Sequence, residues 1–240
     1  MNRMILTLAL VAIVAMPALA NKPVIETQGG LDRIECGLQN VCWEWMGEYY
    51  TETCDTGGAS VWQYGASNNP EVPTVDCNGD PLGDVLATVL NGDYVNDAGE
   101  RAVFEPMITV DETCYLAEFC YFFDIEGNYD GFNVEFIVNG DPVVIEPMGG
   151  GYTDAQLSTS TSYYAWCVDL QPGYSGHDYP GFFKDCYDLS AFDGQSGYLA
   201  IKFGSDSSVT YPGVYVASVV VGGLETPAES TNWSTIKKLY

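Results

Sequence analysis

The 240-residue chain is poor in basic side chains, with 8 lysines and arginines against 33 aspartates and glutamates. The formal charge of -25 argues against binding to nucleic acid or to an anionic membrane, because both require a positively charged protein face. The sequence has one histidine, His177, and neither a Cys-x-x-Cys pair nor a His-Glu-x-x-His motif. These absences argue against a zinc site and against most metallopeptidase and histidine-based hydrolase mechanisms.

Long apolar runs are also scarce. Residues 1–20, MNRMILTLALVAIVAMPALA, combine one basic residue, an apolar run and a small-residue cleavage pattern, which are the three parts of a secretory signal peptide. The apolar run is about 13 residues long, shorter than the ~20 residues that a spanning helix needs. We interpret 1–20 as a signal peptide, and we expect a secreted, extracellular chain with no membrane span.

The cysteines agree with export. Their number is even, and all follow the predicted signal peptide: Cys36, Cys42, Cys54, Cys77, Cys114, Cys120, Cys167 and Cys186. An oxidising compartment favours disulfides between them. Closeness in sequence favours the local pairs Cys36–Cys42 and Cys167–Cys186. On one extended strand, Cys114 and Cys120 would lie about 20 Å apart, so either Cys114 precedes that strand on a turn or both pair elsewhere.

The hydrophobic pattern is that of short strands separated by turns, and no amphipathic helical pattern of about 12 residues or more is evident. Alternation in 132–138 places Phe132, Val134, Phe136 and Val138 on one face, and Asn139-Gly140 after it is a strong hairpin signal. Expected strands cover 102–110, 116–126, 132–138, 143–146, 162–170, 197–203 and 213–221. This pattern predicts an all-β protein with a single, disulfide-stapled jelly-roll or β-sandwich domain.

The expected organisation has four parts. The signal peptide, 1–20, is followed by an N-terminal lead, 21–34, which we expect to be unstructured. The sandwich domain covers 35–223. A polar linker and short tail, 224–240, close the chain.

Five groups of residues resemble, in this order, the MAM-like jelly-roll domain that accompanies immune inhibitor A type metallopeptidases and occurs in many secreted bacterial proteins. They cover about 60–222 and are Trp62-Gln63-Tyr64-Gly65 with Thr88 and Leu90-Asn91-Gly92-Asp93-Tyr94, Glu105-Pro106, Phe123-Asp124-Ile125-Glu126 with Asp130-Gly131, Asp188 to Gln195, and Gly213-Val214-Tyr215-Val216.

This resemblance implies a binding or accessory domain, here without the peptidase. In the family, an early glutamate, which would be Glu35, often helps to bind a cation together with one or two aspartates in the closing strand. Ala217 and Ser218 occupy those aspartate positions here, so the sequence departs from the family's cation-binding set.

Two groups of acidic residues are candidate calcium ligands. Asp76, Asn78, Asp80 and Asp84 stand at positions 1, 3, 5 and 9 of a segment that resembles the first half of a calcium loop. The same residues are also typical of a turn that binds no ion. The alternative ligand set is Asp124, Glu126 and Asp130, in which the first two side chains share one face of a strand.

The stretch 152–187 is rich in aromatic residues, which are suited to stacking on sugars or to packing against a protein partner. Glycines and prolines predict a loop over 171–182. The candidate ligand-binding residues are Trp166, Tyr174 and Tyr179, and we expect Tyr174 and Tyr179 to be exposed. The alternative is core packing of rings such as Tyr163, Trp166 and Phe182.

These features favour a secreted, non-catalytic binding or adhesion module that recognises an extracellular glycan or protein and is stabilised by calcium. One alternative is a jelly-roll glycoside hydrolase or lyase that uses Asp124, Glu126 and Asp130, since carboxylate pairs perform that chemistry. The other is an extracellular structural or surface-assembly subunit, in which the tail directs assembly.

Overall fold

The computed structural model describes residues 25–28, 31–54, 60–157, 167–168, 170–176 and 180–224, with side chains from Ile34 onward. The described residues belong to one compact unit. The predicted signal peptide, residues 225–240 of the predicted linker and tail, and the candidate residues Trp166 and Tyr179 lie outside the described residues.

Two antiparallel sheets of six strands contain most of the described strands. Sheet 1 runs in the order β11 (Asp141–Ile145), β10 (Gly131–Val138), β13 (Ser196–Gly204), β7 (Gly99–Phe104) and β4 (Tyr49–Thr53), with β8 (Ile108–Thr109) paired to β13. Sheet 2 runs in the order β12 (Phe183–Asp188), β9 (Leu116–Asp124), β14 (Gly213–Gly223), β6 (Asp84–Ala87) and β5 (Gln63–Ala66), with β3 (Asn40–Glu44) paired to β14.

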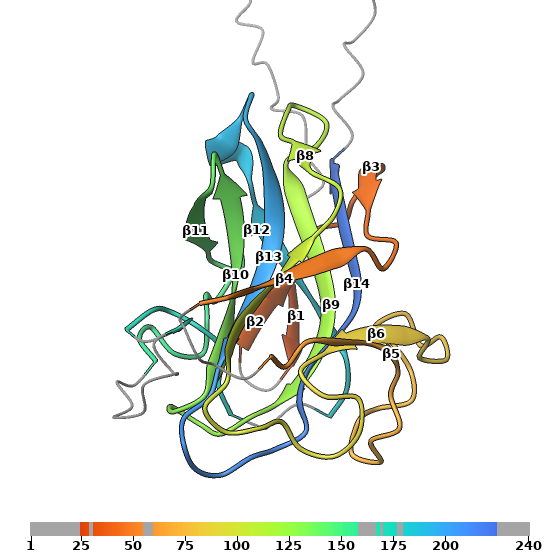
Figure 1. Ribbon diagram of the computed structural model, residues 1–240. Helices are drawn as coiled ribbons and strands as arrows, with labels where there is room; N and C mark the ends of the chain where they lie inside the picture. The colour runs from red at the N-terminus through yellow and green to blue at the C-terminus, as the bar shows by residue number, and fades with distance from the viewer. Residues whose placement is uncertain are drawn as a thin grey trace, which may run out of the picture. The chain divides into compact units, whose positions relative to one another are not determined.

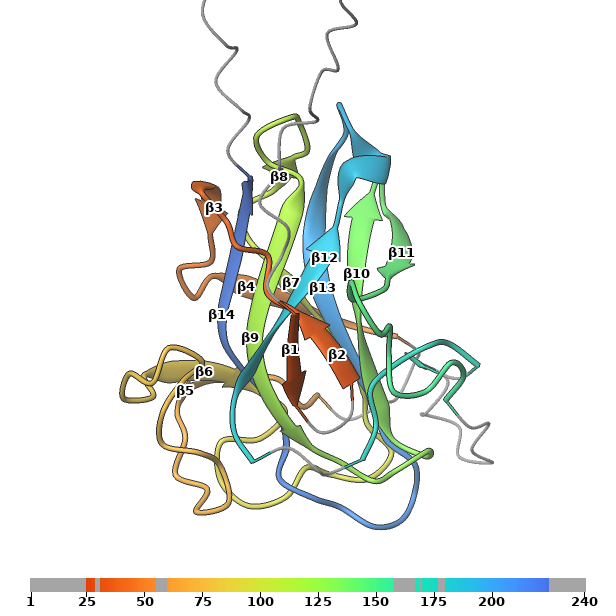
Figure 2. The ribbon, with the colours of Figure 1, turned by 180° about the vertical axis from the view of Figure 1, so that it is seen from behind.

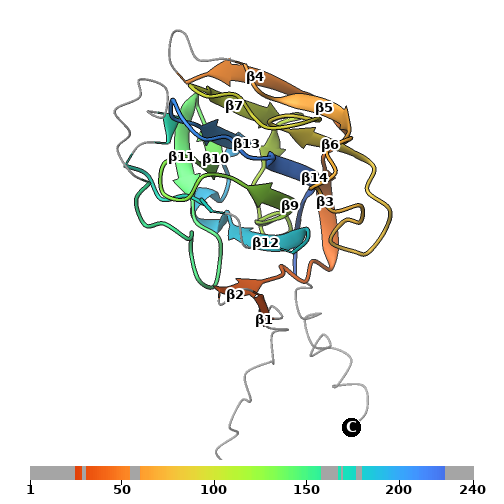
Figure 3. The same ribbon diagram turned by 90° about the horizontal axis from the view of Figure 1, so that it is seen from below.

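The two sheets face each other as a sandwich (Figures 1 and 3). The 3-10 helix η2 (Ser190–Phe192) connects β12 to β13, and no α-helix occurs in the described residues. The described residues also contain no apolar helix of membrane-spanning length. The predicted all-β class and the sandwich are therefore confirmed.

The core lies between the sheets, where the inward side chains of β9 and β10 meet. Phe123 of β9 lies edge-on to Phe132 of β10, with ring centroids 5.0 Å apart. The predicted inward set of β10, Phe132, Val134, Phe136 and Val138, is buried as expected. Edge-to-face rings of this kind add to the free energy gained from their burial.

The predicted hairpin at Asn139-Gly140 is confirmed. Val138 of β10 pairs with Asp141 of β11, and the two turn residues have φ angles of 54° and 87°. Asparagine and glycine tolerate this left-handed backbone better than other residues, so these two residues are enough to predict the turn.

The lead segment was expected to be unstructured, and this expectation is wrong for its second part. Strands β1 (Ile25–Gln28) and β2 (Leu31–Ile34) pair antiparallel, with Ile25 opposite Ile34. Figure 2 shows the pair next to β12, which β2 contacts. The pairing satisfies backbone hydrogen-bonding groups that a free lead would leave to water.

All eight cysteines form disulfides, but the predicted local pairs are wrong. The bonds are Cys36–Cys186, Cys42–Cys114, Cys54–Cys167 and Cys77–Cys120. Cys114 does precede β9, as one alternative required, and both Cys114 and Cys120 pair elsewhere.

Strand pairing explains the long-range partners. Gly222 of β14 pairs with Val41 on one side and with Leu116 on the other, which brings Cys42 close to Cys114. On β12, Cys186 lies opposite Glu118, whose carboxylate accepts the N–H of Cys36 at 3.1 Å. Strand pairing thus brings cysteines that are distant in sequence within bridging distance. Cysteines that are close in sequence contact different strands and do not pair with each other.

Candidate functional site on the outer face of sheet 1

Every second side chain of a strand in sheet 1 points away from the core. Figure 3 shows β10, β13, β7 and β4 side by side. The register aligns two outward rows across these four strands: Asn133, Lys202, Arg101 and Glu52 in one, and Glu135, Ala200, Val103 and Tyr50 in the other. We call this surface the outer face of sheet 1.

A buried ion network occupies the middle of the outer face. The carboxylate of Glu135, which is 2% exposed, accepts hydrogen bonds from Lys202 Nζ at 2.5 Å and from Arg101 Nε at 2.6 Å. Arg101 also donates to the exposed Glu52 at 3.1 Å. Burial lowers the pKa of Lys202, and the attraction of Glu135 opposes that shift.

A pocket of about 330 Å³ opens beside this network, and we call it the polar pocket. Arg101, Lys202, Glu135 and Gln171 line it, together with the disulfide Cys54–Cys167. The side-chain oxygen of Gln171 accepts from Lys202 at 2.7 Å and from Asn133 at 3.1 Å. The disulfide therefore ties the end of β4 to the segment that supplies Gln171.

A second pocket of about 440 Å³ lies on the same face, and we call it the tyrosine pocket. Tyr50, Tyr198 and the half-exposed Met107 line it together with Arg101, which borders both pockets. The rings of Tyr50 and Tyr198 meet edge to face, with centroids 6.3 Å apart. Beneath Tyr198, a small apolar cluster consists of Val103, Ile137 and Ala200.

The chemistry of the tyrosine pocket suits a ligand with one apolar side and polar edges. Tyr50 is 37% exposed, and burial together with nearby Glu52 raises the pKa of its phenol. The hydroxyl group therefore stays protonated at neutral pH and can both donate and accept a hydrogen bond. Rigid rings with a polar tip are common contact residues for sugars and proteins.

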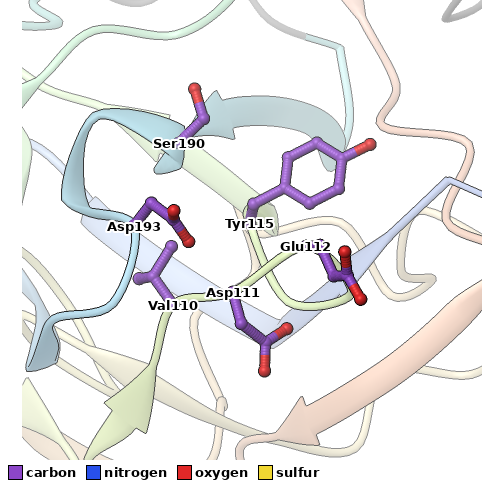
Figure 4. A pocket seen from close by; sticks show the side chains of 6 residues that line it. All are labelled: Val110, Asp111, Glu112, Tyr115, Ser190 and Asp193. Atoms are coloured by element: carbon purple, nitrogen blue, oxygen red, sulfur yellow. The ribbon is translucent and has the colours of Figure 1, made fainter.

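A third pocket, of about 330 Å³, lies elsewhere and is acidic. Figure 4 shows its lining, Val110, Asp111, Glu112 and Tyr115 before β9 with Ser190 and Asp193 around η2. The carboxylate of Asp111 accepts the N–H and the hydroxyl of Thr113, and these bonds lower its pKa. An acidic pocket would favour a cationic group.

A partly buried carboxylate cluster lies at one end of the sandwich, where the β9–β10 and β13–β14 connections meet (Figure 1). Glu126, Asp130 and Asp206 bring one oxygen each within 4.8 Å of one another. Asp130 is fully buried, and its oxygens accept from the Tyr94 hydroxyl at 2.5 Å and from the Asp206 N–H at 2.6 Å. Glu126 Oε2 is buried and has no hydrogen-bond partner among the residues that the structure describes.

Burial raises the pKa of two members of this cluster. Desolvation raises the pKa of Asp130 to about 7, although the hydrogen bonds from Tyr94 and Asp206 act in the opposite direction. Burial and the neighbouring Asp206 also raise the pKa of Glu126. Such clustered oxygens are the ligand type that calcium prefers, and a bound cation would relieve the repulsion between them.

The structure brings together two of the three alternative calcium ligands. Glu126 and Asp130 belong to the carboxylate cluster, and Asp206 completes it in place of Asp124. In the described residues, Asp76, Asp80 and Asp84 do not form such a group. Instead, Asp76 Oδ1 accepts the N–H groups of Asn78 and Asp80 at 2.8 and 3.0 Å, as in an Asx turn. Calcium at this loop, including Asn78 and Asp84, stays a prediction.

The expectation that Tyr174 is exposed is wrong. Tyr174 is 1% exposed, and its hydroxyl donates to the buried Asp185 at 2.6 Å. The backbones of Tyr174 and Phe132 form an isolated β-bridge, and the two rings pack against each other in the core. Tyr174 can pack in the core because a buried carboxylate satisfies its hydroxyl group.

Sequence reasoning missed the residues that border the pockets on the outer face. The available signal was that Arg101 and Lys202 interrupt apolar strands in a chain with only 8 basic residues. Asp206 and Tyr94 carried no local signal, because their roles depend on contacts with Asp130 from distant segments.

No family model matches the chain, and no curated protein matches it. The resemblance to MAM-like domains therefore stays a prediction. Among solved structures, the chain is similar to the K2 cleaved adhesin domain of Lys-gingipain, with 13% sequence identity and a TM-score of 0.37. The similarity covers 72% of this chain and 88% of that chain. Neither fold nor function is inferred from so weak a similarity.

Proposed function

We propose that this protein is a secreted, non-catalytic binding module that holds a glycan on the outer face of sheet 1. The observation that supports this proposal is the tyrosine pocket, where two tyrosine rings stand beside Arg101, Glu52 and Asn139. A sugar ring offers an apolar side to aromatic rings and hydroxyl groups to polar neighbours. The pocket volume of about 440 Å³ is within the usual range for small-ligand sites.

Export is part of this proposal. It is supported by the signal-like segment 1–20 and by four disulfides, which persist in oxidising compartments. A protein partner on the same face is the competing outcome, and the binding experiment distinguishes the two.

The test is binding of the secreted, disulfide-bonded chain to an array of neutral and acidic oligosaccharides in calcium buffer. We expect at least one oligosaccharide to bind, and Tyr50→Ala to lower its affinity by about ten-fold or more. Val143→Ala is the matched control, because Val143 is an exposed apolar residue on β11 that does not line the tyrosine pocket. Absence of glycan binding, or unchanged affinity in Tyr50→Ala, would contradict the proposal.

We also propose that the carboxylate cluster of Glu126, Asp130 and Asp206 binds calcium. The unpartnered Glu126 Oε2 and the raised pKa of Asp130 support a site that is more stable with a cation than without one. A cation that binds only the folded state stabilises it by mass action.

Thermal unfolding in millimolar calcium and in chelator tests this proposal. We expect a higher melting temperature with calcium, no calcium effect in Glu126→Gln, and an unchanged effect in Asp80→Asn. Loss of the effect in Asp80→Asn instead would place the ion in the predicted loop. Identical curves for the unmodified chain would reject calcium.

Catalysis is not part of the proposed function. A glycoside hydrolase needs two carboxyl groups that reach the substrate, whereas Asp130 is fully buried and both of its oxygens accept hydrogen bonds. Turnover of a polysaccharide panel that disappears in Glu126→Gln would establish the enzyme alternative. The assembly alternative rests on the tail, and it stays a prediction outside the described residues.

A further inference from the structure

Two of the three basic side chains that the structure describes lie on one surface of this acidic protein. Three basic side chains are described, Arg101, Lys184 and Lys202. Lys184 pairs with Glu118 on sheet 2, at 3.2 Å. The other two both line the polar pocket, in which Glu135 is the one acid among the described lining residues, so this lining does not share the strong acidic excess of a chain with a formal charge of -25.

Arg101 has N–H donors that remain available to a ligand. A guanidinium group has five N–H donors, and within the described residues Arg101 uses one at Nε for Glu135 and one at Nη1 for Glu52. Its side chain remains 14% exposed, and it borders both the polar pocket and the tyrosine pocket. The remaining donors suit an acceptor with two oxygens, such as a carboxylate or a sulfate.

The polar pocket is held in shape by groups that a ligand need not supply. Glu135 fixes Arg101 and Lys202 from below, and the disulfide Cys54–Cys167 holds the segment of Gln171. Asn133, opposite Lys202 in the register, is fully buried, and its Oδ1 has no hydrogen-bond partner in the described residues. A site ordered before binding loses less entropy when the ligand arrives.

From these observations we propose that the outer face of sheet 1 selects acidic glycans. The anionic group, a carboxylate or a sulfate ester, binds to Arg101 from the polar pocket side, while the adjoining sugar ring lies in the tyrosine pocket against Tyr50 and Tyr198. This inference rests on the proposed glycan function and specifies the substrate class of the same face.

The experiment measures affinity for two matched pairs of oligosaccharides by calorimetry, with calcium in the buffer. The uronate pair is a hexagalacturonate and its methyl ester, and the sulfate pair is a carrageenan hexasaccharide and its desulfated form. We expect the anionic member of at least one pair to bind about ten-fold or more tightly than its neutral counterpart, and this advantage to shrink with added salt. The pair that shows the advantage identifies the source of the charge.

Three variants locate the interaction. Arg101→Gln removes most of the preference for the anionic member, whereas Lys184→Gln, which changes the net charge equally on sheet 2, leaves it unchanged. Glu52→Gln removes the exposed acid beside Arg101 and raises the affinity for the anionic member by about two- to five-fold. Because Glu52 is exposed, this last variant tests the inference even if Arg101→Gln does not fold.

The possible failures can be told apart. Equal affinity for charged and neutral members, or no gain in Glu52→Gln, overturns the acidic preference and leaves the proposed glycan function standing. Binding of a polyglutamate peptide without binding of any oligosaccharide overturns both. If Lys184→Gln also lost the preference for the anionic member, the preference would come from net charge, and the role of Arg101 would be overturned.

Discussion

The outer faces of the two sheets differ in how far the chain's own loops cover them. On sheet 2, outward residues such as Phe122 and Tyr215 form a second apolar cluster with Val72 and Phe182, which come from loops folded over the strands. The disulfide Cys77–Cys120 fastens one of those loops to β9. On sheet 1, the outward Tyr50 stays partly exposed beside two pockets.

This difference separates a structural surface from a candidate binding surface. A sheet face covered by its own loops buries apolar area and contributes to the free energy of unfolding. The outer face of sheet 1 has the exposed ring of Tyr50 and Arg101 N–H groups that the described residues do not use, so it keeps groups that a ligand can contact. Substitutions on the two faces should therefore have opposite consequences.

The largest effect on stability is expected from Phe122→Ala on the covered face. Phe122 is 4% exposed and contacts the rings of Phe182 and Tyr215. Removing a buried phenylalanine lowers the free energy of unfolding by about 3–5 kcal/mol, because it loses apolar burial and leaves a cavity. Chemical denaturation checks this value, and a change below about 1 kcal/mol would show that the loops do not bury this face in solution.

The double variant Cys77→Ser, Cys120→Ser should have the next largest effect. It lowers the free energy of unfolding by about 2–4 kcal/mol, because the unfolded chain gains freedom when this cross-link is removed. Below the melting temperature, glycan affinity should stay unchanged, since the bond belongs to the covered face. A large loss of affinity with an intact circular dichroism spectrum would mean that the two faces are coupled.

The carboxylate cluster gives a smaller effect that depends on pH. Burial raises the pKa of Asp130 from 3.8 to about 7, so its neutral form is favoured in the folded state. Its contribution to stability is fully present below the unfolded pKa and is lost as pH rises through about 7. In chelator, the melting temperature should thus be higher near pH 5.5 than near pH 8.

Asp130→Asn is the comparison variant, because it removes the titrating group and keeps one oxygen as acceptor, so that only one of the hydrogen bonds from Tyr94 and the Asp206 N–H is lost. The variant should show a weaker pH dependence between these two values. An equally steep dependence in the variant would assign the effect to other acids of this strongly acidic chain.

The smallest effect on stability is expected from Tyr50→Ala on the open face. Tyr50 is 37% exposed but loses its edge-to-face contact with Tyr198, so the free energy of unfolding should fall by about 1 kcal/mol, while glycan affinity falls by about ten-fold or more. Denaturation and binding measured on the same preparation check this prediction. A loss of several kcal/mol would place Tyr50 among the structural residues and remove the contrast between the faces.

Local signals in the sequence predicted part of the local structure, although the expected strand 162–170 is absent at its described residues 167, 168 and 170. The alternation of 132–138 and the Asn139-Gly140 turn correspond to β10 and its hairpin with β11, because both depend on neighbouring residues. Strands β1 to β6 and β12 were not predicted, since short segments of mixed polarity become strands through their partners rather than through their own pattern.

The candidate site was less predictable. Glu126 and Asp130 were predicted as part of the set with Asp124, but Asp206 joins them from a connection after β13. Tyr174 looked like a loop aromatic, and its burial depends on Asp185 and Phe132. Arg101 and Lys202 lie about a hundred positions apart in the sequence and meet only because β7 and β13 pair.

Composition and short-range pattern determined the strongly acidic character, the all-β class and the even set of cysteines available for pairing. The tertiary structure decided which cysteines bond, which face of each sheet is covered, and which charges share a pocket. The reason is physical: strand propensity and turn geometry act between neighbours, whereas burial, disulfide partners and ion pairs depend on distances that only the paired sheets create.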